Sequence, residues 1–235
     1  MVYQSLSGKV TGGTRNYARG AACMHCPKPV VEACSEIEHG YRRSPGHAME
    51  LLSGLAHYES LIGWSARDLR GVVCEAIFVG RFDWLRDEKG WDVHYPIVET
   101  YTGEAYKLLP QTPGKRVEAR RHPNNDSVAE FDCVAKIENH WTLGEAKLAG
   151  QFHPKDARRK VGAFMETGIV AAEEVPAFVL GVPEDHPINR GQGYGKRRFE
   201  ESGGKVLVFR GVTSHYIGML AGDLAQRMKS REHPE

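Results

Sequence analysis

The chain has 235 residues, of which 41% are hydrophobic and 26% are charged, and its formal net charge is +1. This size and composition are typical of a soluble globular protein that buries one core and carries an extension. The near-zero net charge does not indicate a nucleic-acid-binding protein, so such a function has to be inferred from local basic clusters.

The cysteine content and the hydropathy pattern exclude two further classes of protein. Five cysteines are an odd number, and three of them crowd within residues 23–34, which does not fit the disulfide framework of a small secreted domain. The segment MVYQSLSGKV lacks an apolar run of signal-peptide length, and no window approaches the ~18 consecutive apolar residues of a membrane span. We therefore expect a protein of the reducing cytoplasm with no membrane partner.

Residues 1–44 are predicted to form an N-terminal extension, whose first half is rich in Gly, Ser, Thr and Arg without an apolar period. Two thiolates with the spacing C-x2-C on a tight turn can hold one metal ion. The candidate ligands follow in the order C-x2-C-x7-C-x4-H and are Cys23, Cys26, Cys34 and either His39 or His25. Two interpretations remain open: a zinc or iron–sulfur centre, or reduced, partly buried thiols beside a proline-rich turn.

Residues 45–235 are predicted to form one α/β domain that begins with two helices. Apolar residues recur at helical spacing over residues 45–64. A second amphipathic helix begins at the N-cap Ser65 and continues through residues 66–87. Glu75 lies among the apolar residues of this helix; taken alone, it is a carboxylate at the helix edge that faces solvent.

The segment after these helices is predicted to contain one strand and a long loop. Residues 91–101 have the β-branched and aromatic composition of a strand. Residues 102–127 contain prolines and glycines and are predicted to form a loop or an irregular hairpin. Its basic residues form either a solvated face or a surface that contacts phosphates; they are Lys115, Arg116, Arg120 and Arg121.

The remaining elements alternate between helix and strand. A helix begins at Pro154, residues 175–183 form a continuous apolar run that is typical of a buried central strand, and residues 206–212 form another strand. A terminal amphipathic helix begins near Ser214. This order predicts a central mixed β-sheet flanked by helices.

Two basic clusters near the ends of these strands could hold a polyanion. One lies on the polar face of the helix after Pro154, and the other lies in a Gly-rich loop that lacks the spacing of a phosphate-binding P-loop. The residues are Lys155, Arg158, Arg159 and Lys160 in the helix and Lys196, Arg197 and Arg198 in the loop. Each cluster could equally be an ordinary solvated face.

Residues 130–147 are predicted to form a β-hairpin with its turn at Glu138 and Asn139, because Asn tolerates the left-handed conformation of a tight turn. Counting outward from this turn gives the opposed pairs Ile137 and His140, Val134 and Leu143, Asp132 and Glu145, and Glu130 and Lys147. Directly opposed residues share one face of the sheet. Two acids and a lysine are therefore expected to cluster at the open end of the hairpin.

This cluster suggests chemistry on phosphate esters. Two carboxylates that face each other repel unless a positive charge compensates them, and a divalent cation supplies that charge. Oxygen ligands suit Mg²⁺ or Mn²⁺, which can lower the pKa of a bound water and stabilise charge on a phosphate. Lys147, on the same face as Glu145, could orient the attacking water or neutralise the phosphate.

Asp132, a gap of twelve residues and the triplet Glu145-Ala146-Lys147 resemble the motif of the PD-(D/E)xK nuclease superfamily, which includes restriction endonucleases, Holliday-junction resolvases and DNA-repair nucleases. The resemblance covers residues 65–182. It implies that Asp132, Glu145 and the carbonyl group of Ala146 bind the metal, and that Lys147 has the role of the catalytic lysine.

The resemblance also implies a restriction-endonuclease-like α/β core that follows the Cys-containing extension, and a Mg²⁺-dependent endonuclease or exonuclease that hydrolyses DNA. RNA as a substrate and a homodimer for double-strand cleavage are both compatible with the sequence. Glu75 corresponds to the helical acid of many family members. Glu130 is either a further acid of the metal site or a partner of Lys147, and Gln151 and His153 lie where they could touch substrate, although each could instead be a loop or cap residue.

Other interpretations remain open. The acid-x-Lys spacing occurs a second time, at Asp87-Glu88-Lys89 in a turn, so the spacing alone does not identify a site. The trio of Asp132, Glu145 and Lys147 could be an ordinary salt bridge on an exposed sheet face. In functional terms, the alternatives are a non-catalytic nucleic-acid-binding module with a degenerate core and a zinc knuckle, and a hydrolase of small nucleotides.

Overall fold

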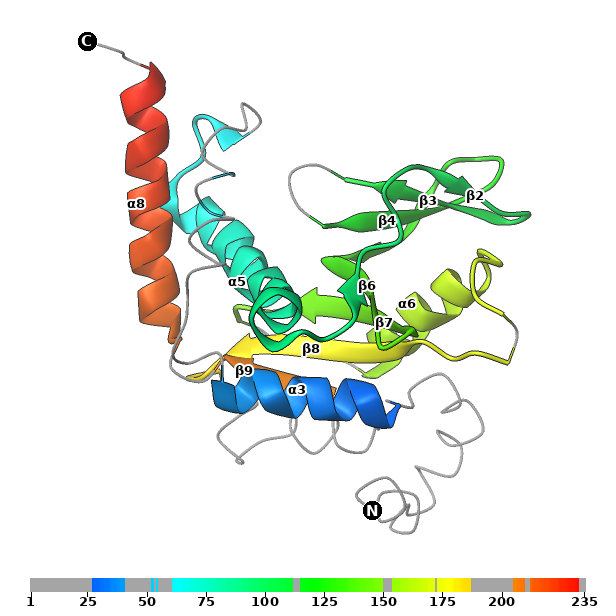
Figure 1. The fold of residues 1–235 in the computed structure, drawn as a ribbon. Helices are drawn as coiled ribbons and strands as arrows, with labels where there is room; N and C mark the ends of the chain where they lie inside the picture. The colour runs from blue at the N-terminus through cyan, green and yellow to red at the C-terminus, as the bar shows by residue number, and fades with distance from the viewer. Residues whose placement is uncertain are drawn as a thin grey trace.

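The computed structural model describes residues 27–40, 52, 54, 61–111, 115–149, 154–171, 173–186, 205–209 and 212–232. These residues form two β-sheets with helices packed around them, so the predicted mixed α/β class is confirmed (Figure 1). No helix in the described ranges is long and apolar enough to cross a membrane. The predicted helix over residues 45–64, the cysteines Cys23 and Cys26, and the Gly-rich loop with Lys196, Arg197 and Arg198 lie largely or wholly outside the described residues.

The five-stranded sheet has the order β1-β6-β7-β8-β9. Its strands are β1 (Val93–His94), β6 (Cys133–Ile137), β7 (His140–Ala146), β8 (Ala177–Pro183) and β9 (Lys205–Phe209). The pairs β1–β6 and β6–β7 are antiparallel, whereas β7–β8 and β8–β9 are parallel. The sheet is therefore mixed, as predicted, and all seven residues of β8 are buried, as expected for a continuous apolar strand between two neighbours.

The second sheet is antiparallel, with the order β2-β3-β4-β5. Its strands are β2 (Tyr101–Thr102), β3 (Tyr106–Pro110), β4 (Val117–Arg121) and β5 (Ser127–Phe131). For residues 102–127 the loop alternative is therefore wrong and the irregular-hairpin alternative is confirmed, because β3 and β4 pair in antiparallel register and β2 and β5 extend the pair into a sheet. Leu108, Val117 and Ala119 supply a buried face, whereas Lys107, Glu118 and Arg120 are only partly buried. The apolar Leu109 next to Leu108 interrupts this period-2 pattern in the sequence.

The predicted strand over residues 91–101 is also wrong in its length. Only Val93–His94 and Tyr101–Thr102 pair with neighbouring strands, and they belong to different sheets. Pro96 lies between them, and a proline has no N–H group to donate to a ladder of hydrogen bonds.

Alternate residues of the five-stranded sheet contribute to two separate cores. On one face, Ala177 and Val179 pack with α3 (Lys28–Gly40), α5 (Ala66–Lys89) and α8 (Ser214–Glu232). On the other face, Phe178 and Leu180 pack with α6 (Pro154–Met165) and with the buried face of the second sheet. The sheet thus lies between a layer of three helices and a layer made of one helix and the smaller sheet.

The long helix α5 begins where the sequence predicts, but it continues two residues beyond the predicted end, to Lys89, so Asp87-Glu88-Lys89 lies in the helix and not in a turn. The hydroxyl of Ser65 accepts a hydrogen bond from the N–H of Asp68, and the Asp68 carboxylate accepts one from the N–H of Ser65, which completes a capping box. At the other end, Gly90 adopts a left-handed conformation with φ of 71° and donates to the carbonyl oxygen of Arg86. α8 packs beside α5, with Ile217, Leu220, Leu224 and Met228 buried as predicted (Figure 1).

Candidate active site

The predicted hairpin is present with the predicted turn and register. Glu138 and Asn139 have positive φ values of 49° and 63°, as a tight two-residue turn requires. Glu138 tolerates this conformation while its side chain accepts a hydrogen bond of 3.1 Å from the N–H of Asp92. Ile137 is opposite His140 and Val134 is opposite Leu143, so the predicted register is confirmed for β6 and β7.

Asp132 lies at the bend where the chain leaves β5 and enters β6. Its N–H donates to the carbonyl oxygen of Gly144 at 3.0 Å, and its Oδ2 atom accepts a hydrogen bond of 2.7 Å from the N–H of Ala146. These two bonds hold Asp132 across from Glu145, as the register predicts. Both acids are buried, so they do not lie on an exposed sheet face.

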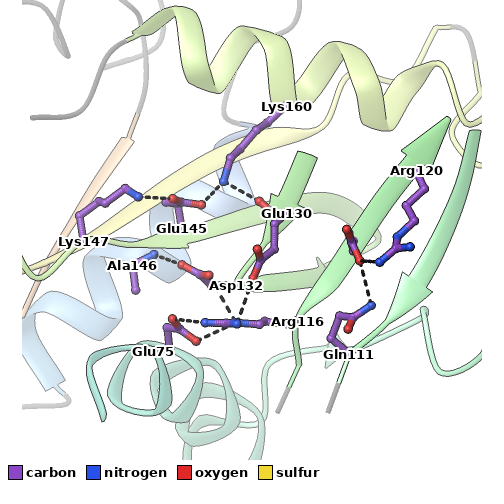
Figure 2. Close-up of polar contacts among 11 residues, drawn as sticks. Glu75, Gln111, Arg116, Arg120, Glu130, Asp132, Glu145, Ala146, Lys147 and Lys160 are labelled. Carbon is purple, nitrogen blue, oxygen red and sulfur yellow. Dashed lines mark hydrogen bonds and ion pairs between the residues drawn. The ribbon is translucent and has the colours of Figure 1, made fainter. Parts of the chain in front are cut away.

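Glu145 is held between two lysines. Its side chain is only 8% exposed; Oε1 lies 2.7 Å from Nζ of Lys147, and Oε2 accepts a hydrogen bond from Nζ of Lys160 (Figure 2). Lys147 therefore shares the face of Glu145, as predicted. The side chain of Lys147 is 40% exposed, whereas that of Lys160 is only 12% exposed, so the two lysine side chains differ strongly in their access to solvent.

The assignment of Lys160 to a solvated helix face is wrong. Lys160 comes from α6, and its ammonium group also donates to the carbonyl oxygen of Glu130, which ties the helix to β5. A signal for this position exists in the sequence. Lys160 follows Ala157 by three residues and precedes Phe164 by four, and both of these residues are fully buried, so Lys160 borders the apolar stripe of the helix.

Glu75 also belongs to the cluster and does not face solvent at the helix edge. Arg116 donates two hydrogen bonds to its carboxylate, from Nη2 to Oε1 at 2.6 Å and from Nε to Oε2 at 3.0 Å. The same guanidinium contacts Glu130, with Nη1 at 3.0 Å from Oε1, and approaches Asp132, with Nε at 3.9 Å from Oδ1. Figure 2 shows Arg116 lying among these three acids, which come from different elements.

The prediction that Glu130 lies opposite Lys147 is wrong. Glu130 belongs to β5 and pairs with Glu118 of β4, because the bend at Asp132 takes the chain from one sheet into the other. Its carboxylate contacts Arg116, and its backbone carbonyl accepts from Lys160. Glu130 thus remains at the site but approaches it from the second sheet. Sequence reasoning missed Arg116 as a site residue, since a basic residue within an assumed loop gives no signal of its partners.

Burial and mutual repulsion change the protonation of the acids. Burial, together with the nearby charges of Glu75 and Glu145, raises the pKa of Asp132 to about 7. Burial also raises the pKa of Glu75, although Arg116 opposes this shift. For Lys147, burial lowers the pKa, but the hydrogen bond and charge of Glu145 outweigh it, so its pKa is raised and the ammonium form is favoured. The site therefore holds Lys147 in its protonated form and, in Asp132, a carboxyl group that titrates near neutral pH.

The other candidate residues are only partly described. Lys155 is exposed on α6 and Arg158 is half-buried, while Arg159 donates a hydrogen bond to the carbonyl oxygen of Val128 in β5. Cys34 is buried in the core on α3, and His39 lies in the last turn of that helix. Gln151 and His153, like Cys23 and Cys26, are outside the described residues.

Comparison of this chain with protein-family models, with curated proteins and with solved structures finds no match. Within the described ranges, no group of three or more His, Cys, Asp or Glu side chains has the arrangement of a metal site. The acids are instead neutralised by side chains. Glu75, Glu130, Asp132 and Glu145 are arranged around three cations, Arg116, Lys147 and Lys160.

Proposed function

We propose that this chain is a divalent-metal-dependent nuclease that hydrolyses phosphodiester bonds, with DNA as its substrate. The observation that carries the proposal is the burial of Asp132 beside Glu145, with the ammonium group of Lys147 at 2.7 Å from Glu145. Clustered acids with altered pKa values cost stability, and such arrangements are concentrated in functional sites. A purely structural sheet would have apolar residues at these positions.

The donor set has the chemistry of a magnesium or manganese site. The side chains of Glu75, Asp132 and Glu145 offer only oxygen atoms, which these cations prefer. The N–H of Ala146 points toward Asp132, and in a strand the carbonyl group of the same residue leaves on the same side, so it too is directed toward the acids. The donor atoms are of the type that such a cation needs. They are not gathered around one common position, because Arg116 lies among them.

A bound divalent cation would supply Lewis-acid stabilisation of a phosphate oxygen and a lowered pKa for a coordinated water. The chain itself contributes fixed positive charge and a fixed carboxylate. Lys147, with a raised pKa and a partly exposed ammonium group, can neutralise charge that develops on the phosphate or orient the attacking water. Lys160 holds the other oxygen of Glu145 and so fixes the orientation of that carboxylate.

The order of elements supports the resemblance to the PD-(D/E)xK superfamily. An acid on a helix (Glu75 on α5), the Asp strand, the Glu-x-Lys strand, a helix (α6) and a buried strand (β8) follow one another along the chain. The mixed sheet and the helices on its two faces agree with a restriction-endonuclease-like core. We place the substrate-binding surface on the side of α6, where Lys155 is exposed.

The test is a cleavage assay of wild type and Asp132→Ala on supercoiled plasmid, branched DNA and RNA, with Mg²⁺, with Mn²⁺ and with chelator. We expect metal-dependent cleavage of DNA by wild type and none by Asp132→Ala. A gel-shift assay of the same proteins separates the alternative. If wild type shifts DNA but cleaves nothing under any metal condition, the chain is a non-catalytic binding module, and turnover of free nucleotides alone identifies a small-molecule hydrolase. Elemental analysis for zinc and iron tests the cysteine site separately.

A further inference from the structure

The guanidinium of Arg116 contacts two of the three carboxylates that the proposed function assigns to the metal, Glu75 and Asp132, whereas the third, Glu145, pairs with Lys147 and Lys160. Arg116 makes two hydrogen bonds to Glu75, contacts Glu130 at 3.0 Å and lies 3.9 Å from Asp132. Three different elements, α5, β5 and the bend before β6, thus direct an acid at one cation. The side chain of Arg116 remains 35% exposed, so it has a path out of the cluster into solvent.

Arginine is the one cationic side chain that cannot relieve this arrangement by losing its proton, because its pKa stays above the physiological range in proteins. A divalent cation and the guanidinium therefore compete for the same oxygens. A double charge within a few Å of a fixed single charge is strongly repelled at the partial screening of such a site. Both cannot hold Glu75 and Asp132 at once.

We propose that Arg116 acts as a built-in counter-ion that occupies the metal position in the metal-free protein, so that divalent-cation binding requires its displacement. This inference rests on the proposed function for the identity of the cation. It accounts for the present partners of the acids: Arg116 holds Glu75 and lies 3.9 Å from Asp132, whose carboxylate otherwise accepts only from the backbone N–H of Ala146 among the hydrogen bonds of the described residues. Arg116 thereby sets the metal affinity of the site and acts as a positioning residue for the acids.

The neighbouring Arg120 provides a matched control. It lies in β4, four residues further along the chain, has a similar exposure of 33% and also forms an ion pair, but its partner is Glu118 at 2.9 Å. Figure 2 shows Arg120 apart from Asp132 and Glu145. Removing Arg120 deletes the same charge from the same sheet without opening the acid cluster.

The test measures Mn²⁺ binding to metal-stripped full-length protein by isothermal titration calorimetry, for wild type, Arg116→Met, Arg116→Lys and Arg120→Met. Loss of the competing charge should tighten Mn²⁺ binding of Arg116→Met by about tenfold or more. Arg116→Lys keeps the charge but loses the two-pronged hydrogen bond, so it should tighten binding by a smaller factor. Arg120→Met should bind as wild type does. A rise in melting temperature with added Mn²⁺ should follow the same ranking.

Equal affinities in wild type and Arg116→Met, weaker binding in Arg116→Met, or no Mn²⁺ binding by any of the four proteins would each overturn the inference. If Arg116→Met fails to fold, the comparison of Arg116→Lys with wild type decides by itself. The proposed function is judged separately by cleavage. A wild type that cleaves DNA while Arg116→Met has unchanged metal affinity leaves the nuclease in place and removes only the role of Arg116.

Discussion

The chain contains the acid-x-Lys spacing twice, in two environments that differ in every other respect. Glu145-Ala146-Lys147 ends a strand between two neighbours, and its acid is 8% exposed. Asp87-Glu88-Lys89 ends helix α5; its Asp is 41% exposed and pairs with Arg86, and its Lys is 40% exposed and pairs with Glu36 on α3. The spacing is identical, so the difference in burial and in surrounding acids is what makes only the first triplet a candidate for chemistry.

The largest effect on stability is expected at the acid of the first triplet. Glu145→Gln keeps the size of the side chain but leaves Lys160, which is 12% exposed, without its carboxylate. Removing one partner of a buried ion pair costs about 3 kcal/mol in the free energy of unfolding. Asp87→Asn removes an exposed acid and should change stability by less than about 0.5 kcal/mol. Urea unfolding of both variants measures the contrast, and equal losses would contradict it.

A pH dependence is expected next, at Asp132. Its pKa is raised from 3.8 to about 7 in the folded protein, so between these values the folded state binds more protons than the unfolded state. The free energy of unfolding therefore falls by a few kcal/mol at most as pH rises through this window. Above the window it levels off. Asp132→Asn should remove the fall, whereas Asp87→Asn should retain it. The measurement is the free energy of unfolding at several pH values across the window. If Asp132→Asn keeps the wild-type slope of this free energy against pH, Asp132 is not the group responsible.

The glycines beside the two triplets give a smaller contrast. A Cβ atom at Gly144 would lie 2.5 Å from the ring of Phe78, which is fully buried. Overpacking of this kind costs about 1–3 kcal/mol of stability. Gly144→Ala should also slow cleavage, because Phe78 lies one helical turn from Glu75 and its displacement would disturb that acid. At Gly90 there is open space, but φ is 71°, so Gly90→Ala should cost about 1 kcal/mol through backbone strain and leave cleavage unchanged. A Gly144→Ala protein with wild-type stability would mean that Phe78 has room to move.

The smallest effect is expected at Lys89. Its ion pair with Glu36 spans 3.0 Å between two half-exposed side chains, and such pairs contribute less than about 1 kcal/mol. Lys89→Ala should therefore lower the melting temperature slightly, and high salt should reduce the difference from wild type. A large, salt-independent loss would show that the second triplet is more than a surface pair.

The parts of the fold that were predictable from the sequence are those with strong local signals. Ser65 marks the start of α5, and the Asn139 turn fixes the register that brings Asp132 to Glu145. The second sheet was predictable only as an irregular hairpin, one of two alternatives, because β3 and β4 are short and Leu109 interrupts the alternation of apolar and charged residues. This ambiguity had a consequence for the site, since Arg116 and Glu130 reach it only through that sheet.

The partners of the acids depend on tertiary structure. The hairpin register predicts that Lys147 lies beside Glu145, because both are on one strand. No pattern within α6 predicts that Lys160 reaches Glu145, and no pattern in the chain predicts that Arg116 lies among acids from three elements. Local periodicity indicates which face is buried, whereas these contacts depend on how the two sheets and α6 pack together.

We propose that the first triplet, and not the second, performs chemistry on phosphodiester bonds. The most direct test compares cleavage of supercoiled plasmid in Mn²⁺ by wild type, Lys147→Ala and Lys89→Ala at equal folded concentration. Because we propose that Lys147 neutralises the phosphate or orients the attacking water, its loss should slow cleavage about a hundredfold or more, while Lys89→Ala should cleave at the wild-type rate. Equal rates for the two lysine variants, or a wild type without metal-dependent cleavage, would contradict the account.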